Sequence, residues 1–282
     1  MSDVIIVNPD KLEAIKKAFQ VDGLSQIHVL SDFDRTLTQS FVNGKRVSAL
    51  ISVLREEGYL TPDYSDKAKA MSLKYQPLEA NLELSREDRK KAMESWWREH
   101  FQLLIESGLT RAEIAKASID SGVILRSGAS EFLNYLDSHD IPLVFLSASG
   151  LGQESIKIFL DRENHLFKNT HVICNDFFFD ETGRVIAVKE PIVHICNKDE
   201  TLIHNFPCYG EVKDRRNVIV VGDSIDDIDM VVGFEYKNLI KFGFLNENVE
   251  ENLEKYKEAF DVIILNDGPF TAINNFLQEI DK

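Results

Sequence analysis

The chain has little cysteine and no apolar run long enough for a membrane span. Its three cysteines, Cys174, Cys196 and Cys208, form no Cys-x-x-Cys pair and no even set for a disulfide framework, which is typical of a reducing cytoplasm. No apolar stretch approaches the roughly 20 residues that cross a bilayer. The first ten residues lack the basic region and apolar stretch of a secretion signal. We therefore expect a cytoplasmic protein without a membrane partner.

Positive charge is also scarce. Among 282 residues, 32 lysines and arginines oppose 47 aspartates and glutamates, which gives a formal net charge of −15 at pH 7. Nucleic-acid backbones and anionic membranes attract clustered cations, so neither is an expected partner. A small phosphate substrate remains possible because it needs only a few local donors and a metal ion. The hydrophobic fraction of 44% is enough for a sizeable core. As a separate expectation, we predict that the protein is a monomer.

Four short apolar runs have the length and the β-branched composition of buried strands. Segments with helical periodicity lie between them, at 131–138, 153–160 and 226–233. This alternation predicts an α/β fold, with a Rossmann-like parallel sheet and helices on both of its faces. The expected strands are Ile27–Phe33, Ile141–Ser147, Asn217–Asp223 and Asp261–Leu265.

The strand pattern is interrupted between the first and second of these runs. Ser85 and Thr110 each stand three positions before an acidic residue, which is a helix-start signature. We therefore predict a helical cap domain over 41–119, inserted into a core made of 1–40 and 120–282. The segment Asp176–Ala187 has two strand-like arms around a Thr-Gly pair, which predicts a small β-hairpin flap.

Acidic residues directly follow two of the predicted strands. Asp32 and Asp34 lie in an Asp-x-Asp-x-Thr motif after the first strand, and Asp223 and Asp227 follow the third. The carboxyl ends of parallel strands line the crevice of an α/β sheet, so these groups should meet there. Such a cluster repels itself unless a hard cation binds, and Mg²⁺ prefers oxygen ligands. The alternative interpretations are a turn after the first strand and a helix N-terminus after the third.

Two weaker signals indicate groups that could bind a phosphate. Ser147 begins a Ser-Ala-Ser-Gly-Leu-Gly loop after the second strand, where small residues and helix N-terminal amides suit a phosphate oxygen. Alone, this loop is equally typical of a turn and cap. Lys198 lies in a partly apolar stretch and could supply the cation that carboxylates and a phosphate require. The degenerate Gly150-x-Gly152-x-x-Ser155 leaves a dinucleotide-binding module as an alternative, although its third glycine is missing.

These residues, in this order, resemble the haloacid dehalogenase superfamily of phosphatases. From about Ser31 onward the chain is similar to the cytosolic pyrimidine 5′-nucleotidases (type III), whose members include 7-methylguanosine-phosphate-specific 5′-nucleotidases. The resemblance implies a Mg²⁺-dependent enzyme that hydrolyses nucleoside 5′-monophosphates, such as CMP, UMP or 7-methyl-GMP, to nucleoside and phosphate. A phosphatase of the same superfamily for another small phosphoester is the alternative. The stretches that carry the closer resemblance are 74–79, 145–148, 179–183, 194–198, 222–227, 243–246 and 253–256.

The resemblance also implies a role for each carboxylate. Asp32 would be the nucleophile that forms an aspartyl-phosphate. Asp34 would protonate the leaving nucleoside oxygen and then act as the base for the hydrolytic water. Mg²⁺ would be held by Asp32, by the backbone carbonyl of Asp34 and by Asp223, with Asp227 supporting it.

The remaining roles concern the substrate. Ser147, the Ala148 amide and Lys198 would bind phosphate oxygens, and Glu79 in the cap would accept hydrogen bonds from the amino edge of a base. Trp96 could stack on the base.

Three cap residues and one core residue complicate this assignment. Trp97 and Tyr75 are further candidates for base stacking, although a Trp pair at helical spacing is more typical of a core. His100 stands where the family commonly has a serine that contacts substrate. Arg35 replaces a small or apolar residue in the Asp-x-Asp-x-Thr motif.

Overall fold

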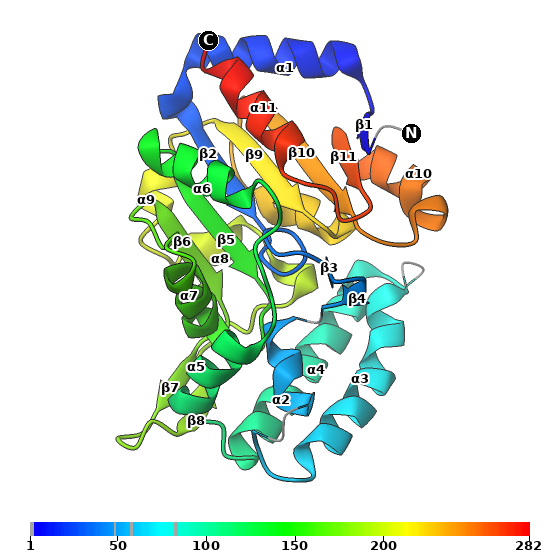
Figure 1. Ribbon diagram of the computed structural model, residues 1–282, viewed down its shortest axis with the longest axis vertical. Helices are drawn as coiled ribbons and strands as arrows, with labels where there is room; N and C mark the ends of the chain where they lie inside the picture. The colour runs from blue at the N-terminus through cyan, green and yellow to red at the C-terminus, as the bar shows by residue number, and fades with distance from the viewer. Residues whose placement is uncertain (1–2, 48, 57–58, 82–83) are drawn as a thin grey trace.

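The computed structural model describes residues 3–47, 49–56, 59–81 and 84–282 (Figure 1). A seven-stranded sheet forms its centre, in the order β1-β11-β10-β9-β2-β5-β6. Six strands run parallel, and β1 pairs antiparallel with β11 at one edge. The strands are β1 (Val4–Ile6), β2 (Ile27–Ser31), β5 (Leu143–Ser147), β6 (Thr170–Cys174), β9 (Asn217–Gly222), β10 (Asn238–Leu245) and β11 (Val262–Leu265).

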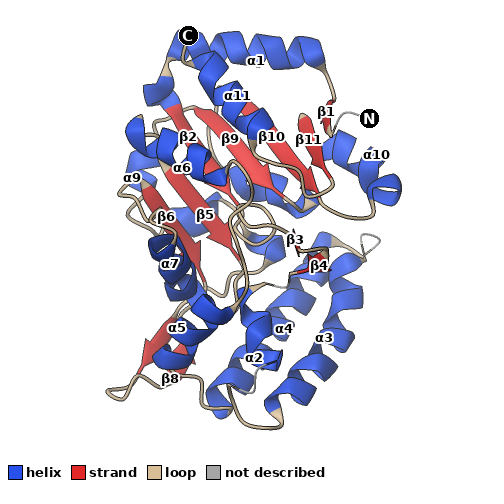
Figure 2. Ribbon diagram, viewed as in Figure 1, coloured by secondary structure: helices blue, strands red, loops and turns tan. Residues whose placement is uncertain are grey.

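Helices cover both faces of this sheet, as Figure 2 shows. Alternate residues of a strand point to opposite faces. Val29 and Ile219 accordingly pack with α1, α6, α7 and α11 on one face, whereas Leu30 and Val218 pack with α9 and the residues near α8 on the other. The helices are α1 (Pro9–Asp22), α6 (Ala129–Ser138), α7 (Gly152–Arg162), α8 (Glu200–Ile203), α9 (Tyr209–Val212), α10 (Val249–Ala259) and α11 (Thr271–Ile280).

A helical layer lies beyond the carboxyl ends of the strands (Figure 1). Two of its helices, α4 and α5, begin where the helix-start signatures predict. The Ser85 hydroxyl accepts a hydrogen bond from the Asp88 amide, and the Thr110 hydroxyl accepts one from the Glu113 amide. Helix α5 packs against α7 of the core. The elements from 41 to 120 are β3 (Phe41–Val42), β4 (Lys45–Arg46), α2 (Val53–Glu56), α3 (Tyr64–Ala80), α4 (Arg86–Glu106) and α5 (Arg111–Asp120).

The predicted α/β fold is confirmed, and so is the hairpin. Strands β7 (Phe177–Phe179) and β8 (Val185–Val188) pair antiparallel, and Gly183 in their turn has φ +82°. The helical period at 226–233 is realised as a 3₁₀ helix, Ile225–Val231. Strands β1, β6 and β10 extend the sheet beyond the four predicted runs. In β10 the polar Lys241 and the small Gly243 interrupt the apolar pattern that marks a buried strand.

No helix in the described part of the chain combines the length and the apolar character that crossing a bilayer requires.

Candidate active site

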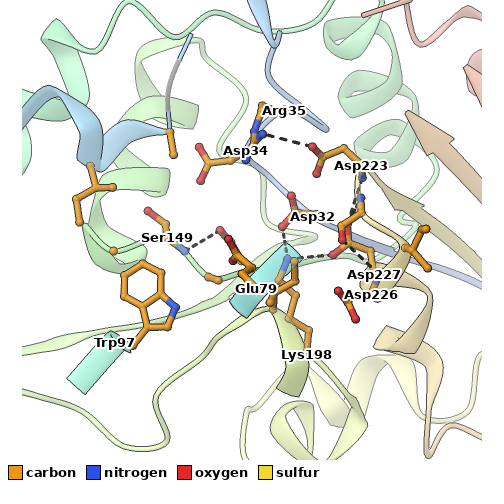
Figure 3. Close-up of a pocket in the computed structure, with 18 of the residues that line it drawn as sticks. Asp32, Asp34, Arg35, Glu79, Trp97, Ser149, Lys198, Asp223, Asp226 and Asp227 are labelled. Atoms are coloured by element: carbon orange, nitrogen blue, oxygen red, sulfur yellow. Dashed lines mark hydrogen bonds and ion pairs between the residues drawn. The ribbon is translucent and has the colours of Figure 1, made fainter. Parts of the chain in front are cut away.

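A cavity of about 410 Å³ lies where β2, β5 and β9 end beneath the helical layer. Both the sheet ends and the helical layer contribute side chains to it, and Figure 3 shows carboxylates gathered at its centre. Most of the groups that the sequence marks for catalysis therefore meet in one place. The lining residues are Asp32, Asp34, Arg35, Ala49, Ile51, Glu79, Arg89, Trp97, Ser147, Ala148, Ser149, Gly150, Ile195, Lys198, Asp223, Ser224, Ile225, Asp226, Asp227 and Tyr256.

The loop after β2 holds the first pair of carboxylates. Hydrogen bonding continues one residue past the strand, because the Asp32 amide donates to the Val221 carbonyl of β9. The chain then turns sharply at Arg35, whose φ is +62°. As a result Asp32, which is 6% exposed, and Asp34 both line the cavity.

Lys198 bridges two of the carboxylates. Its Nζ atom donates to Asp32 Oδ1 at 2.5 Å and to Asp227 Oδ1 at 3.1 Å, and all three side chains are buried. Burial alone would lower the pKa of the lysine, but Asp227 and Asp32 raise it above its ordinary value. Lys198 therefore carries its charge in the cavity at neutral pH.

Three carboxylates lie close enough to share one metal ion. Asp32, Asp223 and Asp227 each offer one oxygen, and these oxygens lie within 4.8 Å of one another. The other oxygen of Asp227, Oδ2, accepts hydrogen bonds from the amides of Asp223 and Ser224. Gly222 permits this arrangement, because a Cβ atom there would stand 2.4 Å from the Cβ of Asp227. An all-oxygen donor set of this kind suits a hard divalent cation.

Burial makes the carboxylates of the cavity hard to ionise. It raises the pKa of Asp34 to about 7, with a further contribution from the charge of Asp32. It raises the pKa of Asp223 to about 6, against the opposing effect of Arg35, and that of Asp227 to about 7, against Lys198. Asp34 can therefore hold a proton near neutral pH, as a general acid must.

The predicted phosphate-binding groups line the same cavity as Asp32. Ser147 and Ala148 line the cavity at the end of β5, and the Ser147 hydroxyl accepts a hydrogen bond from the Ser149 amide at 3.2 Å. Gly150 lets the helical layer approach this loop closely. A Cβ atom at Gly150 would lie 2.4 Å from Ile51 and 2.7 Å from Trp97.

The helical layer contributes Glu79 and Trp97 to the cavity, and Trp96 and His100 lie outside it. Burial raises the pKa of Glu79, and Arg35 and Arg89 oppose that rise. Trp96 stacks on Tyr75, with ring centroids 5.7 Å apart, inside a separate apolar cluster. The structure therefore brings Trp97 to the site in place of the predicted Trp96, because the helix turns the neighbouring position inward.

His100 packs behind Trp97. Their rings are stacked at 5.8 Å, and His100 is 2% exposed, with its Nε2 atom 3.1 Å from the Tyr64 hydroxyl. Burial lowers the pKa of His100 to about 3, so the ring is neutral. It is placed to support the Trp97 ring.

Several lining residues had no role assigned from the sequence. Arg89 of α4 donates to both carboxylate oxygens of Asp226, at 3.1 and 2.7 Å, and so joins the helical layer to the loop after β9. Tyr256 donates its hydroxyl hydrogen to the Asp223 carbonyl at 2.5 Å. Partners this distant in the chain leave no local sequence signal.

Known proteins resemble this chain over nearly its whole length. A sequence model of the pyrimidine 5′-nucleotidase (UMPH-1) family matches residues 35–281. A Gallus gallus protein named 7-methylguanosine phosphate-specific 5′-nucleotidase is 28% identical over 280 residues, covering 99% of this chain and 96% of that protein. A Caenorhabditis elegans protein named putative cytosolic 5′-nucleotidase 3 is 31% identical over 287 residues, covering 99% of this chain and 76% of that protein.

Solved structures agree. The crystal structure of cytosolic 5′-nucleotidase IIIB bound to cytidine superposes with a TM-score of 0.89 at 26% identity, covering 100% of this chain and 94% of that one. A substrate-bound phosphoserine phosphatase, with a TM-score of 0.55 and 17% identity, covers 89% of this chain and 97% of that one and shares the fold. The resemblance noted in the sequence is thereby confirmed: the chain belongs to the pyrimidine 5′-nucleotidase (UMPH-1) family and is a phosphoric monoester hydrolase.

Proposed function

We propose that the protein is a Mg²⁺-dependent 5′-nucleotidase that hydrolyses nucleoside 5′-monophosphates through an aspartyl-phosphate, an acyl phosphate formed on Asp32. The observation that carries this proposal is the contact of Asp32 with Lys198 in a cavity that also holds Asp34 and Asp223. The printed names of the relatives support a pyrimidine or 7-methylguanosine nucleotide as the substrate.

Two displacements at phosphorus complete the reaction. In the first, a carboxylate oxygen of Asp32 forms a bond to phosphorus, the bond to the ester oxygen breaks, and Asp34 gives its proton to the departing nucleoside. In the second, a water oxygen forms a bond to the same phosphorus, the bond between phosphorus and the Asp32 oxygen breaks, and Asp34 takes a proton from the water. Phosphate then leaves, and both aspartates return to their starting states. Lys198, Ser147 and the Ala148 amide would hold the phosphate oxygens throughout.

The residues present fit a magnesium ion. Asp32, Asp223 and the backbone carbonyl of Asp34 would hold it, and Asp227 would support it through its hydrogen bonds to the loop amides. When bound, Mg²⁺ would neutralise part of the negative charge that otherwise repels a phosphate dianion from the nucleophile.

The nucleoside would occupy the part of the cavity beneath the helical layer. Trp97 offers an aromatic face for stacking, and Glu79 offers a carboxylate for the amino edge of a base. We also propose, from the sequence, that 41–119 acts as a cap domain over a core of 1–40 and 120–282, and that the protein is a cytoplasmic monomer.

Initial rates on a panel of phosphate monoesters test the proposed function. The panel contains CMP, UMP, 7-methyl-GMP, GMP, phosphoserine and para-nitrophenyl phosphate, each with Mg²⁺ and with EDTA. We expect a nucleotide to have the highest kcat/KM and EDTA to abolish turnover. A higher kcat/KM for phosphoserine than for every nucleotide would contradict the proposal.

Exchanging each tryptophan for alanine separates their roles. Trp97→Ala should raise KM for the preferred nucleotide roughly ten-fold, since base stacking contributes about 1–3 kcal/mol, and should change kinetics on para-nitrophenyl phosphate little. Trp96→Ala is the matched control. It should lower the melting temperature, because Trp96 packs in the cluster with Tyr75 and Met93, and leave KM nearly unchanged. The reverse pattern would restore Trp96 as the stacking residue.

The pKa values of the cavity carboxylates predict how pH affects the metal-free protein. Asp34, Asp223 and Asp227 have pKa values of about 7, 6 and 7 in the fold, above their ordinary value of 3.8. Between pH 3.8 and about 7, the folded protein therefore binds more protons than the unfolded chain. Its free energy of unfolding falls as pH rises through this range. In thermal melts, we expect Mg²⁺ to raise the melting temperature more at pH 8 than at pH 5.5. An equal or larger shift at pH 5.5 would contradict this.

A further inference from the structure

We propose that Arg35 is the counter-ion of Asp223 in the metal-free enzyme and that Mg²⁺ must displace its guanidinium to bind. This inference rests on the proposed function, because it takes Asp223 as a magnesium ligand.

The backbone of Arg35 is held in a conformation that few residues adopt. Its φ of +62° lies in the left-handed region, which is uncommon for residues other than glycine and requires support from the surroundings. That support comes from three hydrogen bonds. The Arg35 backbone amide donates to the Thr38 hydroxyl at 2.8 Å, and its carbonyl accepts from the side-chain Nδ2 of Asn246 at 3.0 Å and from the guanidinium of Arg126.

Arg126 makes this support rigid. Its side chain is fully buried, pairs with Asp267 at 2.8 Å and also donates to the carbonyls of Thr36 and Thr38. The turn that carries Arg35 is therefore fixed from the core side. Its side chain is directed into the cavity, on the side of Asp223 (Figure 3).

Within the cavity, Arg35 is the cation that faces Asp223. Its Nε atom lies 3.9 Å from Asp223 Oδ2. The other lining cations are already engaged, Lys198 by Asp32 and Asp227 and Arg89 by both oxygens of Asp226. Among the described residues, Arg35 is the partner that forms an ion pair with Asp223. Within the described part of the chain, the other group that donates to this carboxylate is the Thr36 hydroxyl, at 3.5 Å, and Lys198 and Arg126 act on it by charge without forming an ion pair with it.

A divalent ion bound by Asp223 would compete with this guanidinium. The two positive charges would share one carboxylate, so Arg35 must weaken metal binding relative to an uncharged side chain. The cost of displacing it is modest, because the Arg35 side chain is 38% exposed and its ion pair is long and partly screened by solvent. Arg35 would thus keep the carboxylate cluster folded without metal and give way when Mg²⁺ arrives.

Calorimetric titration of EDTA-stripped protein with Mg²⁺, in the absence of substrate, tests this inference. Arg35→Met removes the charge and keeps a long side chain, and it should bind Mg²⁺ roughly three- to ten-fold more tightly than the wild type. Its metal-free form should also melt at a lower temperature. Arg35→Lys, the matched control, keeps the charge and should stay within about twofold of the wild type. High salt should reduce the difference between the wild type and Arg35→Met.

The outcomes are separable. Unchanged or weaker Mg²⁺ binding by folded Arg35→Met overturns the role of Arg35, and so does an equal gain in Arg35→Lys, because the charge would then not be the cause. Arg35→Gln repeats the test if the methionine variant does not fold. Absence of Mg²⁺ binding by the wild type would overturn the proposed function itself, which distinguishes the two failures.

Discussion

Replacing Asp32 with asparagine is expected to lower kcat/KM for the preferred nucleotide by about 10⁴-fold or more. The side-chain amide of asparagine cannot form the acyl phosphate that the first displacement requires. Loss of a nucleophile has effects of at least this size in enzymes whose catalytic groups act as a unit. The substitution keeps the shape of the side chain, and Lys198 can still donate to the amide oxygen. The nucleotide should therefore still bind.

Three measurements make this prediction specific. Steady-state rates give the loss in kcat/KM, and equilibrium titration shows whether the nucleotide still binds. Acid-quenched wild-type enzyme should carry phosphate on the peptide that contains Asp32, and Asp32→Asn should not. Asp229→Asn is the matched control, because Asp229 lies in the same 3₁₀ helix as Asp227, is absent from the cavity lining and pairs with Arg86. It should retain activity within about twofold. Full phosphate release by Asp32→Asn would refute the nucleophile assignment.

The meeting of the cavity carboxylates was predictable from the sequence because local rules place them. An apolar run that ends in Asp-x-Asp-x-Thr marks the carboxyl end of a parallel strand, and all such ends meet at one edge of the sheet. Asp32 and Asp223 had to converge once β2 and β9 were adjacent, as they are. The fold class followed from the same alternation of strands and helices. The burial that shifts the pKa values of these groups was not predictable, since it depends on the helical layer above them.

The helical layer was harder to predict for a physical reason. Helical periodicity shows that one face of α4 is apolar, but that face is divided between a core cluster and a cavity. Trp96 and Trp97 are adjacent in sequence and point to different places, so only the packing of α4 on the sheet decides which one meets a ligand. The contact between Arg89 and Asp226 depends on the same packing. These residues are 137 positions apart in the chain and meet because α4 of the helical layer packs on the carboxyl ends of the strands.

Lys198→Met is expected to have the second large effect, on both rate and stability. Loss of one charged donor at a reacting phosphate lowers kcat by roughly 10²- to 10³-fold in comparable sites. In the metal-free protein the change also leaves Asp32 and Asp227 without their shared cation. Leaving buried charges unpaired costs about 3–5 kcal/mol of unfolding free energy when they stay ionised. Because Lys198 lowers the pKa of Asp227, that pKa should rise further in the variant.

Magnesium separates the two consequences of this substitution. A divalent ion near Asp32 supplies positive charge to the same cluster, so saturating Mg²⁺ should restore much of the melting temperature of Lys198→Met. It should not restore kcat, because the ion cannot replace the ammonium group at the phosphate oxygens. The matched control is Lys189→Met, which removes an exposed lysine paired with Asp176 at 2.6 Å and should change neither kcat nor stability by much. Recovery of kcat together with stability would show that Lys198 only balances charge and does not contact the phosphate.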